Sequence, residues 1–87
     1  MVQVMENKIG VVAMVISDYS AVEKVNLILH DFRDYIIGRM GIPYRQKNVN
    51  VISVVLDAPN EILNSLSGKL GMINGVNSKL VMHGEKK

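Results

Sequence analysis

Arg39, Arg45 and Lys47 lie close together in the stretch GRMGIPYRQKN, between two strongly apolar runs. An arginine there could bind a carboxylate or phosphate, because a guanidinium donates two parallel hydrogen bonds to such a group. A structural explanation competes with this chemistry. Gly38 and Gly41 are typical of a bulge or close backbone approach in an edge strand, where a cation also blocks stray pairing. We favour the structural explanation and keep Gly38 and Arg39 as candidate ligand-binding residues.

A second candidate site lies where Asp18, Tyr19 and Ser20 precede an expected helix. The N-terminus of a helix offers free backbone amides and a positive dipole end, which together can hold a small anionic ligand. The competing interpretation is that Ser20 caps the helix, with Glu23 completing a capping box. We favour the cap and keep the three residues as candidate ligand-binding positions.

Other side chains give no pattern for catalysis or metal binding. The two histidines, His30 and His83, show none of the spacings that are typical of metal ligands. The serines lie in no nucleophile-elbow context, and the sequence has no cysteine. We therefore predict no catalytic residue, no metal site and no cofactor.

The charge and composition of the chain limit the kinds of partner that we expect it to bind. The net charge is +2 and the pI is about 9.0, but cations and anions are interleaved along the chain. Because no basic stripe emerges, we do not expect direct DNA binding. With 48% hydrophobic residues and a mean hydropathy of +0.19 in 87 residues, the chain has more apolar surface than so small a monomer can bury. This composition predicts self-association.

Hydrophobic periodicity predicts the elements that would position these residues. Their order is strand, helix, strand, strand, helix, strand, over residues 8–17, 21–32, 34–42, 48–57, 59–71 and 77–83. The turn between the middle strands is expected at PYRQK, because Pro43 lacks a donor for a strand ladder. The order βαββαβ is typical of an α+β ferredoxin-like sandwich, with a four-stranded antiparallel sheet and two helices on one face. We expect a single domain over residues 1–87, with flexible tails at 1–7 and 84–87.

The first expected strand is apolar on both of its faces. Ile9, Val11 and Val15 alternate with Val12 and Met14, whereas a sheet face exposed to water should alternate toward polar residues. With both helices on one face, the other must be covered differently. We predict a homo-oligomer, a dimer or a tetramer, in which another subunit covers it.

Three features of the sequence indicate the cellular compartment. A chain without cysteine suits a reducing environment, and the longest apolar run is far shorter than the roughly 20 residues of a membrane span. The N-terminus also lacks the pattern of a signal peptide. We expect a cytoplasmic protein that does not associate with membranes.

Five segments together resemble the family of iron-only hydrogenase system regulators. They are VNLILHDF, IIGRMGIPY, NVISVVLD, LSGKLGMINGV and SKLVM. Members of that family resemble ACT-type regulatory domains and the C-terminal domain of the nickel-responsive repressor. The resemblance implies a ligand site at a subunit interface near the first strand-to-helix loop, formed by Asp18, Tyr19 and Ser20, with Gly38 and Arg39 from a neighbouring edge. The repressor's nickel site does not carry over, since residues 39–51 contain neither histidine nor cysteine.

The function expected from this resemblance is regulation of the iron-only hydrogenase system without enzymatic activity. The domain would act through a small anionic ligand or a protein partner of that system. Two alternatives stay open. One is a small dimeric ferredoxin-like enzyme of the monooxygenase or isomerase type, with His30 as the helix candidate for an acid or base. The other is a nucleic-acid-binding regulator, whose binding would depend strongly on salt.

Overall fold

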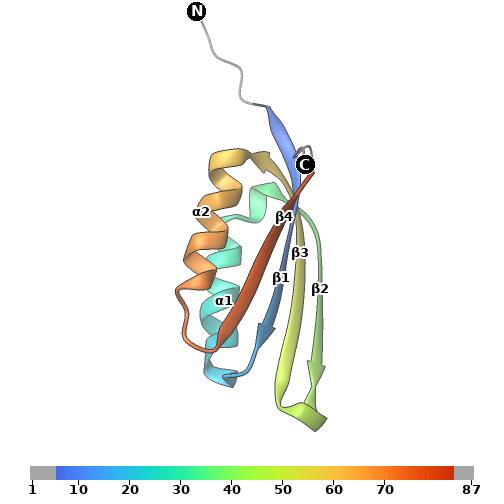
Figure 1. Cartoon of the computed structure of the whole chain (residues 1–87), viewed down its shortest axis with the longest axis vertical. Coiled ribbons are helices and arrows are strands. Elements are labelled where there is room, and N and C mark those ends of the chain that lie inside the picture. Colours follow the sequence, from blue (N-terminus) through green and yellow to red (C-terminus); the bar gives the residue numbers. More distant parts are fainter. Residues whose placement is uncertain (1–5, 84–87) are drawn as a thin grey trace, which may run out of the picture.

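The structure, a computed structural model, describes residues 6–83. Its order is βαββαβ, as predicted, with two additional short 3-10 turns (Figure 1). The elements are β1 (Asn7–Ile16), α1 (Tyr19–Asp31), η1 (Arg33–Tyr35), β2 (Ile36–Tyr44), η2 (Arg45–Lys47), β3 (Val49–Pro59), α2 (Asn60–Gly71) and β4 (Val76–Met82). The tails expected at 1–7 and 84–87 lie largely outside the described residues, and Asn7 already belongs to β1.

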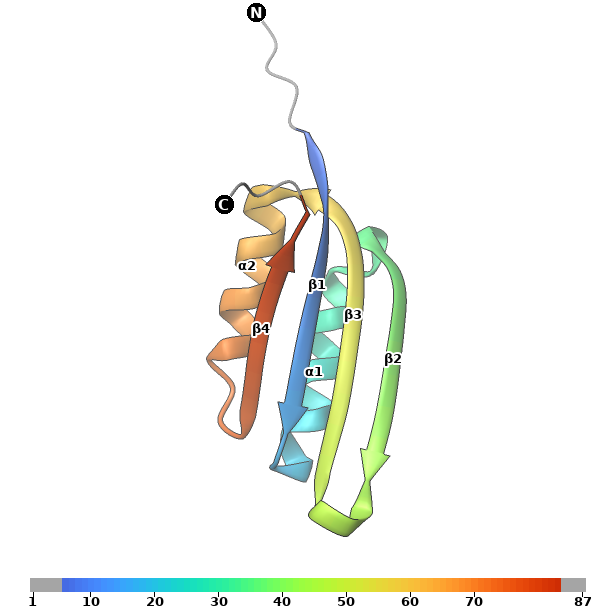
Figure 2. The same cartoon turned by 45° about the vertical axis from the view of Figure 1, so that its right-hand side comes forward.

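The four strands form one antiparallel sheet in the order β2-β3-β1-β4. Both helices cover the same face of this sheet, and the opposite face carries no element of the described chain (Figures 1 and 2). The predicted α+β ferredoxin-like sandwich is therefore confirmed. We call the sheet face opposite the helices the outer face.

The core lies between the sheet and the helices. Alternate residues of the central strands face the helices and are fully buried, including Val12 in β1 and Val54 in β3. Each helix contributes a buried stripe at helical spacing, such as Leu63, Leu66 and Leu70 of α2. Burying one such side chain stabilises the fold by about 1.5–3 kcal/mol. This single core fixes both helices against the sheet.

The start of α1 differs from the predicted capping box. The helix begins at Tyr19, and its N-cap is Asp18, whose carboxylate accepts a hydrogen bond from the Ser20 backbone amide at 3.1 Å. Ser20 lies inside the first turn, where its hydroxyl donates to the same carboxylate at 2.9 Å. The prediction that Ser20 caps the helix was wrong, because the helix begins before Ser20 and the Asp18 carboxylate caps the free amide of Ser20 itself.

The turn between the middle strands also begins later than predicted. Pro43 and Tyr44 belong to β2 and pair with Asn50 and Val49 of β3. Proline is tolerated there because β2 is an edge strand, which needs ladder bonds on one side only. The chain reverses in η2, and Asn48 completes the reversal in the left-handed region at φ 55°. A register shift between Ile36 and Gly38 marks the bulge that the glycine suggested.

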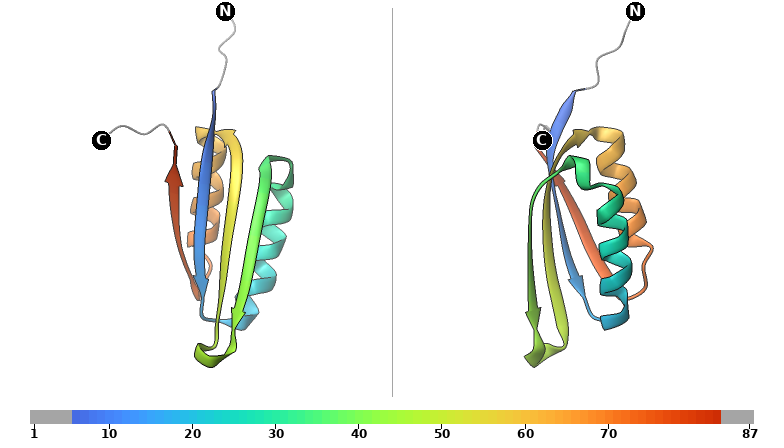
Figure 3. Two further views of the ribbon diagram at one scale, coloured as in Figure 1. Left: turned by 90° about the vertical axis from the view of Figure 1, so that its right-hand side faces the viewer. Right: turned by 180° about the vertical axis from the view of Figure 1, so that it is seen from behind.

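The outer face, which is turned toward the viewer in Figure 3 (left), is strongly apolar. Central positions are aliphatic: Val11, Val51 and Val55 are half-buried, and Val15 is 46% exposed. Larger exposed apolar residues stand at its two edges, with Met40 and Ile42 on β2 and Val81 on β4. None of the helices in the described part of the chain is long and apolar enough to span a membrane.

Candidate functional site

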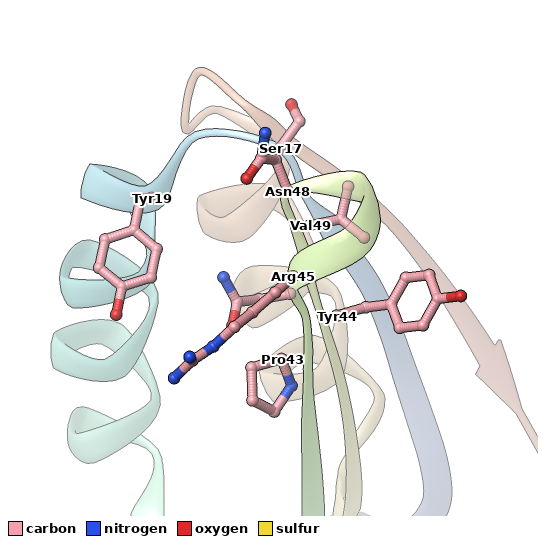
Figure 4. Close-up of a pocket in the computed structure, with 8 residues that line it drawn as sticks. Ser17, Tyr19, Pro43, Tyr44, Arg45, Asn48 and Val49 are labelled. Carbon is pink, nitrogen blue, oxygen red and sulfur yellow. The ribbon is translucent and has the colours of Figure 1, made fainter.

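A pocket forms where the β2–β3 hairpin extends past the end of β1. Strand β1 ends at Ile16, which pairs with Asn50, so the hairpin beyond Asn50 has no neighbour in the sheet on that side. The chain then leaves the sheet through Ser17 and Asp18 and enters α1. The first turn of α1 and the projecting hairpin thus form opposite walls of a pocket at this end of the sheet (Figure 4).

The cavity has a volume of about 530 Å³, within the roughly 300–1,000 Å³ that small-molecule sites occupy. Its lining consists of Ser17, Tyr19, Pro43, Tyr44, Arg45, Asn48, Val49 and Asn50. That set contains one cation, two amides, two phenols and a hydroxyl, and no acidic side chain. The pocket is therefore suited to a ligand that is negatively charged and can accept hydrogen bonds.

The side chains come from both walls (Figure 4). The ring of Tyr19 lies along the first turns of α1, and the guanidinium of Arg45 extends from the hairpin toward it. Pro43 lies below Arg45 on the hairpin side, whereas the ring of Tyr44 points away from α1. An anion held by Arg45 would therefore lie between the helix and the hairpin.

The three predicted site residues of the first loop have different roles in the structure: Asp18 caps α1, and Tyr19 lines the pocket. Asp18 holds the N-terminus of α1, so its carboxylate occupies the amide position that an anionic ligand would need. Ser20 lines a shallower depression along α1 and not the pocket at the hairpin. Tyr19 is 83% exposed and lines both. Of the three residues, Tyr19 alone faces the larger cavity.

Arg39 and Gly38 lie elsewhere. The Nη2 of Arg39 donates to Oδ1 of Asn26 at 2.8 Å and so ties the edge strand to α1. This arginine lines a separate groove beside α1, which also includes His30 and Arg33. Apart from its two neighbours in the chain, no described residue comes within 4 Å of a Cβ built on Gly38. One chain thus does not bring Gly38 and Arg39 to the β1–α1 loop.

Seven of the eight pocket residues, all except Tyr19, were not among the predicted ligand contacts. Arg45 stood in the cationic stretch, but its position opposite Tyr19 depends on where the hairpin turns. Asn48 and Asn50 carried no motif, although Asn at the end of a turn is typical of the left-handed conformation that Asn48 adopts. Among residues 6–83, no three His, Cys, Asp or Glu side chains come together as a metal site would require.

Comparisons with known proteins place the chain in a family. A model of the TM1266-like family, described as "Iron-only hydrogenase system regulator, putative", matches residues 8–80. The structure is similar to that of "uncharacterized protein TM1266" from Thermotoga maritima, with a TM-score of 0.85 and 37% sequence identity, over 90% of this chain and 99% of that chain. A search of curated proteins finds no match.

A more distant likeness concerns the fold alone. A formyltetrahydrofolate deformylase from Pseudomonas putida KT2440 matches with a TM-score of 0.61 and 15% identity, over 84% of this chain but 28% of that one. The chain thus spans less than a third of that protein, and the match shows a shared ACT-like fold. The match of the family model and the 37% identity over nearly the whole length of TM1266 are much stronger evidence of relationship than this likeness of fold. This chain belongs to the TM1266-like family of iron-only hydrogenase system regulators.

Proposed function

We propose that the chain is a non-enzymatic, homo-oligomeric regulatory domain of the iron-only hydrogenase system, which acts through a small ligand or a protein partner. The observation that carries this proposal is the apolar outer face. The family's description supports the regulatory role, and the outer face supports assembly as the means by which such a small domain completes its structure.

The outer face resembles half of a sheet-on-sheet core. Ile42, Val51 and Val15 stand side by side across three strands, as the register of β2, β3 and β1 requires. The next rows are small or aliphatic, with Ala13 opposite Ser53 and Val11 opposite Val55. Two such faces could pack about 10 Å apart and bury these rows against each other. Monomeric proteins rarely expose so continuous an apolar surface.

A second copy of this chain is the occupant that the charges favour. Within the strands, the outer face carries one acid, Asp57, and one base, Lys79, on opposite sides of the apolar centre. A face with balanced charge can meet its own copy without net repulsion. An acidic or basic partner would instead call for an excess of the opposite charge. The face therefore fits an isologous contact, in which the same patch serves both subunits.

Native mass spectrometry of the full chain, without exposure to chelators, tests this proposal. We expect a dimer or tetramer for the wild type, and any retained small ligand would add to the measured mass. Val15→Lys should give a monomer, because burying a lysine within a packed apolar face costs several kcal/mol, which is more than a hundredfold in the dissociation constant.

Leu27→Lys is the matched control. Leu27 is 67% exposed on α1, so the same kind of change there should leave the assembly intact. Circular dichroism checks that both variants fold. A monomeric wild type, or a Val15→Lys variant that keeps the wild-type mass, would refute assembly through the outer face.

A further inference from the structure

We propose that the pocket between the first turn of α1 and the β2–β3 hairpin binds a small anion carried on a planar heteroaromatic ring. A nucleoside monophosphate and a heteroaromatic carboxylate share this chemistry. Arg45 would bind the anionic group, and Tyr19 would stack on the ring. The inference rests on the proposed function in one respect, since it names the ligand class through which the regulatory domain would act.

Arg45 is the anion-binding group. Among the described residues, the guanidinium of Arg39 donates to Asn26 and that of Arg33 donates to the His30 carbonyl, whereas Arg45 donates to no protein group. The guanidinium extends across the cavity toward α1 (Figure 4), and no acidic side chain lines the pocket. A cation in such a position can give two hydrogen bonds to one carboxylate or phosphate.

Tyr19 provides an aromatic surface on the opposite wall. Its side chain is 83% exposed, whereas the buried residues of the same helix are Ala21, Val25 and Leu29. Stacking a flat ring on an exposed aromatic side chain contributes typically about a five- to hundredfold gain in affinity. Pro43 presents a second rigid ring on the hairpin side of the same cavity. These two rings favour a planar group over a branched aliphatic one.

The two amides distinguish a heteroaromatic ring from a purely hydrocarbon one. Asn48 and Asn50 both line the cavity, and each amide can donate and accept hydrogen bonds. Asn48 is held in place because its backbone amide donates to the Arg45 carbonyl at 3.1 Å, which closes the turn. Ring nitrogens and carbonyls at the ligand edge would pair with these amides. A cavity of about 530 Å³ accommodates a ring and an attached anion.

Isothermal titration calorimetry of the full chain tests the proposal with probes that separate its parts. The probes are AMP and UMP, orotate and nicotinate, adenosine and uridine as rings without the anion, and inorganic phosphate as an anion without the ring. We expect a nucleotide or a ring carboxylate to bind at least about tenfold more tightly than either the nucleoside or phosphate alone. Preference for the nucleotides or for the carboxylates identifies the source of the anion.

Variants assign the contacts. Arg45→Gln should weaken the anionic ligand about tenfold or more and leave the weaker nucleoside unchanged, because only the charge pair is lost. Tyr19→Leu should weaken both. Lys47→Gln is the matched control, since Lys47 shares η2 with Arg45 but does not line the pocket. The affinity of this variant for the anionic ligand should stay within about twofold of the wild-type value.

Three results would overturn the proposal. They are no binding of any probe up to about 10 mM, an unchanged affinity in Arg45→Gln, or a larger loss in Arg39→Gln, which would place the anion in the groove beside α1. Native mass spectrometry of the same samples distinguishes a failure of the ligand proposal from a failure of the proposed assembly. An oligomer that binds no probe refutes the ligand class but not the assembly, and a monomer that binds does the reverse.

Discussion

Asp18 does two things at the entrance of α1. Its carboxylate caps the helix through the Ser20 amide, and it holds the Ser20 hydroxyl at 2.9 Å. Replacing an N-cap aspartate with alanine typically costs about 1 kcal/mol. We expect Asp18→Ala to lower the free energy of unfolding by about that amount in urea titrations, and Ser20→Ala to lower it by less than about 0.5 kcal/mol. A larger loss in Ser20→Ala would restore the capping box that the sequence suggested.

The same residue explains which site positions a sequence can reveal. Ser20 and Glu23 match a capping pattern, and so does Asp18 with the amide two residues later, and the pattern alone does not decide between them. Tyr19 was identified by its place in the expected loop before the helix, although in the structure it is the first residue of α1. Arg45 was visible as a cation, but its pairing with Tyr19 across a cavity depends on contacts 26 positions apart in the chain. Local patterns do not report such distances.

At the scale of elements, the backbone conformation of the turn before β4 requires a glycine. Gly75 adopts φ 86°, and a Cβ built there would meet Asp18, with the backbone nitrogen of Asp18 at 3.3 Å. Its carbonyl also accepts a hydrogen bond from the Ser17 amide at 2.8 Å, joining the two turns. We expect Gly75→Ala to destabilise the fold by about 1–3 kcal/mol, through backbone strain and the clash together.

Gly68→Ala is the contrasting substitution. Gly68 lies within α2, and nothing comes within 4 Å of a Cβ added there. Alanine should stabilise that helix by about 0.5–1 kcal/mol. Thermal and urea unfolding of both variants measure the two effects. If Gly75→Ala were as stable as wild type, the turn before β4 would not need a glycine, and the Asp18 contact would not constrain it.

The sequence predicted the helices and strands correctly but placed their ends less accurately. Runs such as VVAMVI and VISVVL predict central strands, because a strand that is apolar at nearly every position is expected to be covered on both faces. Pro43 misled the prediction, since the rule against proline in ladders does not apply to an open edge. The extra length of the hairpin, on which the pocket depends, comes from that difference. An error of two residues at a strand end thus hid the site.

At the scale of the whole molecule, the two proposed surfaces point to opposite sides of the sheet and come near each other at its end. The outer face lies opposite the helices, and Val51 and Val15 lie side by side on it, one residue from Asn50 and two from Ser17 of the pocket lining. The pocket opens on the side of α1, where Tyr19 and Arg45 face each other (Figure 4). Side chains on the two faces of a strand point in opposite directions. A change of the Val15 side chain is therefore expected to leave the Tyr19–Arg45 side of the pocket in place.

These opposite orientations give a prediction that joins the two proposals. Val15→Lys, made to dissociate the oligomer, should bind the preferred anionic ring compound with an affinity within about twofold of wild type, because its side chain points away from the side of the sheet on which Tyr19 and Arg45 lie. Calorimetry on the monomeric fraction measures it, with Leu27→Lys as the folded, assembled control. An affinity that falls together with the oligomer would mean that a second subunit completes the pocket. In that case ligand and assembly would be coupled, and the coupling would be the mechanism by which this domain regulates, since a ligand shifts an equilibrium only as far as it binds one state more tightly than the other.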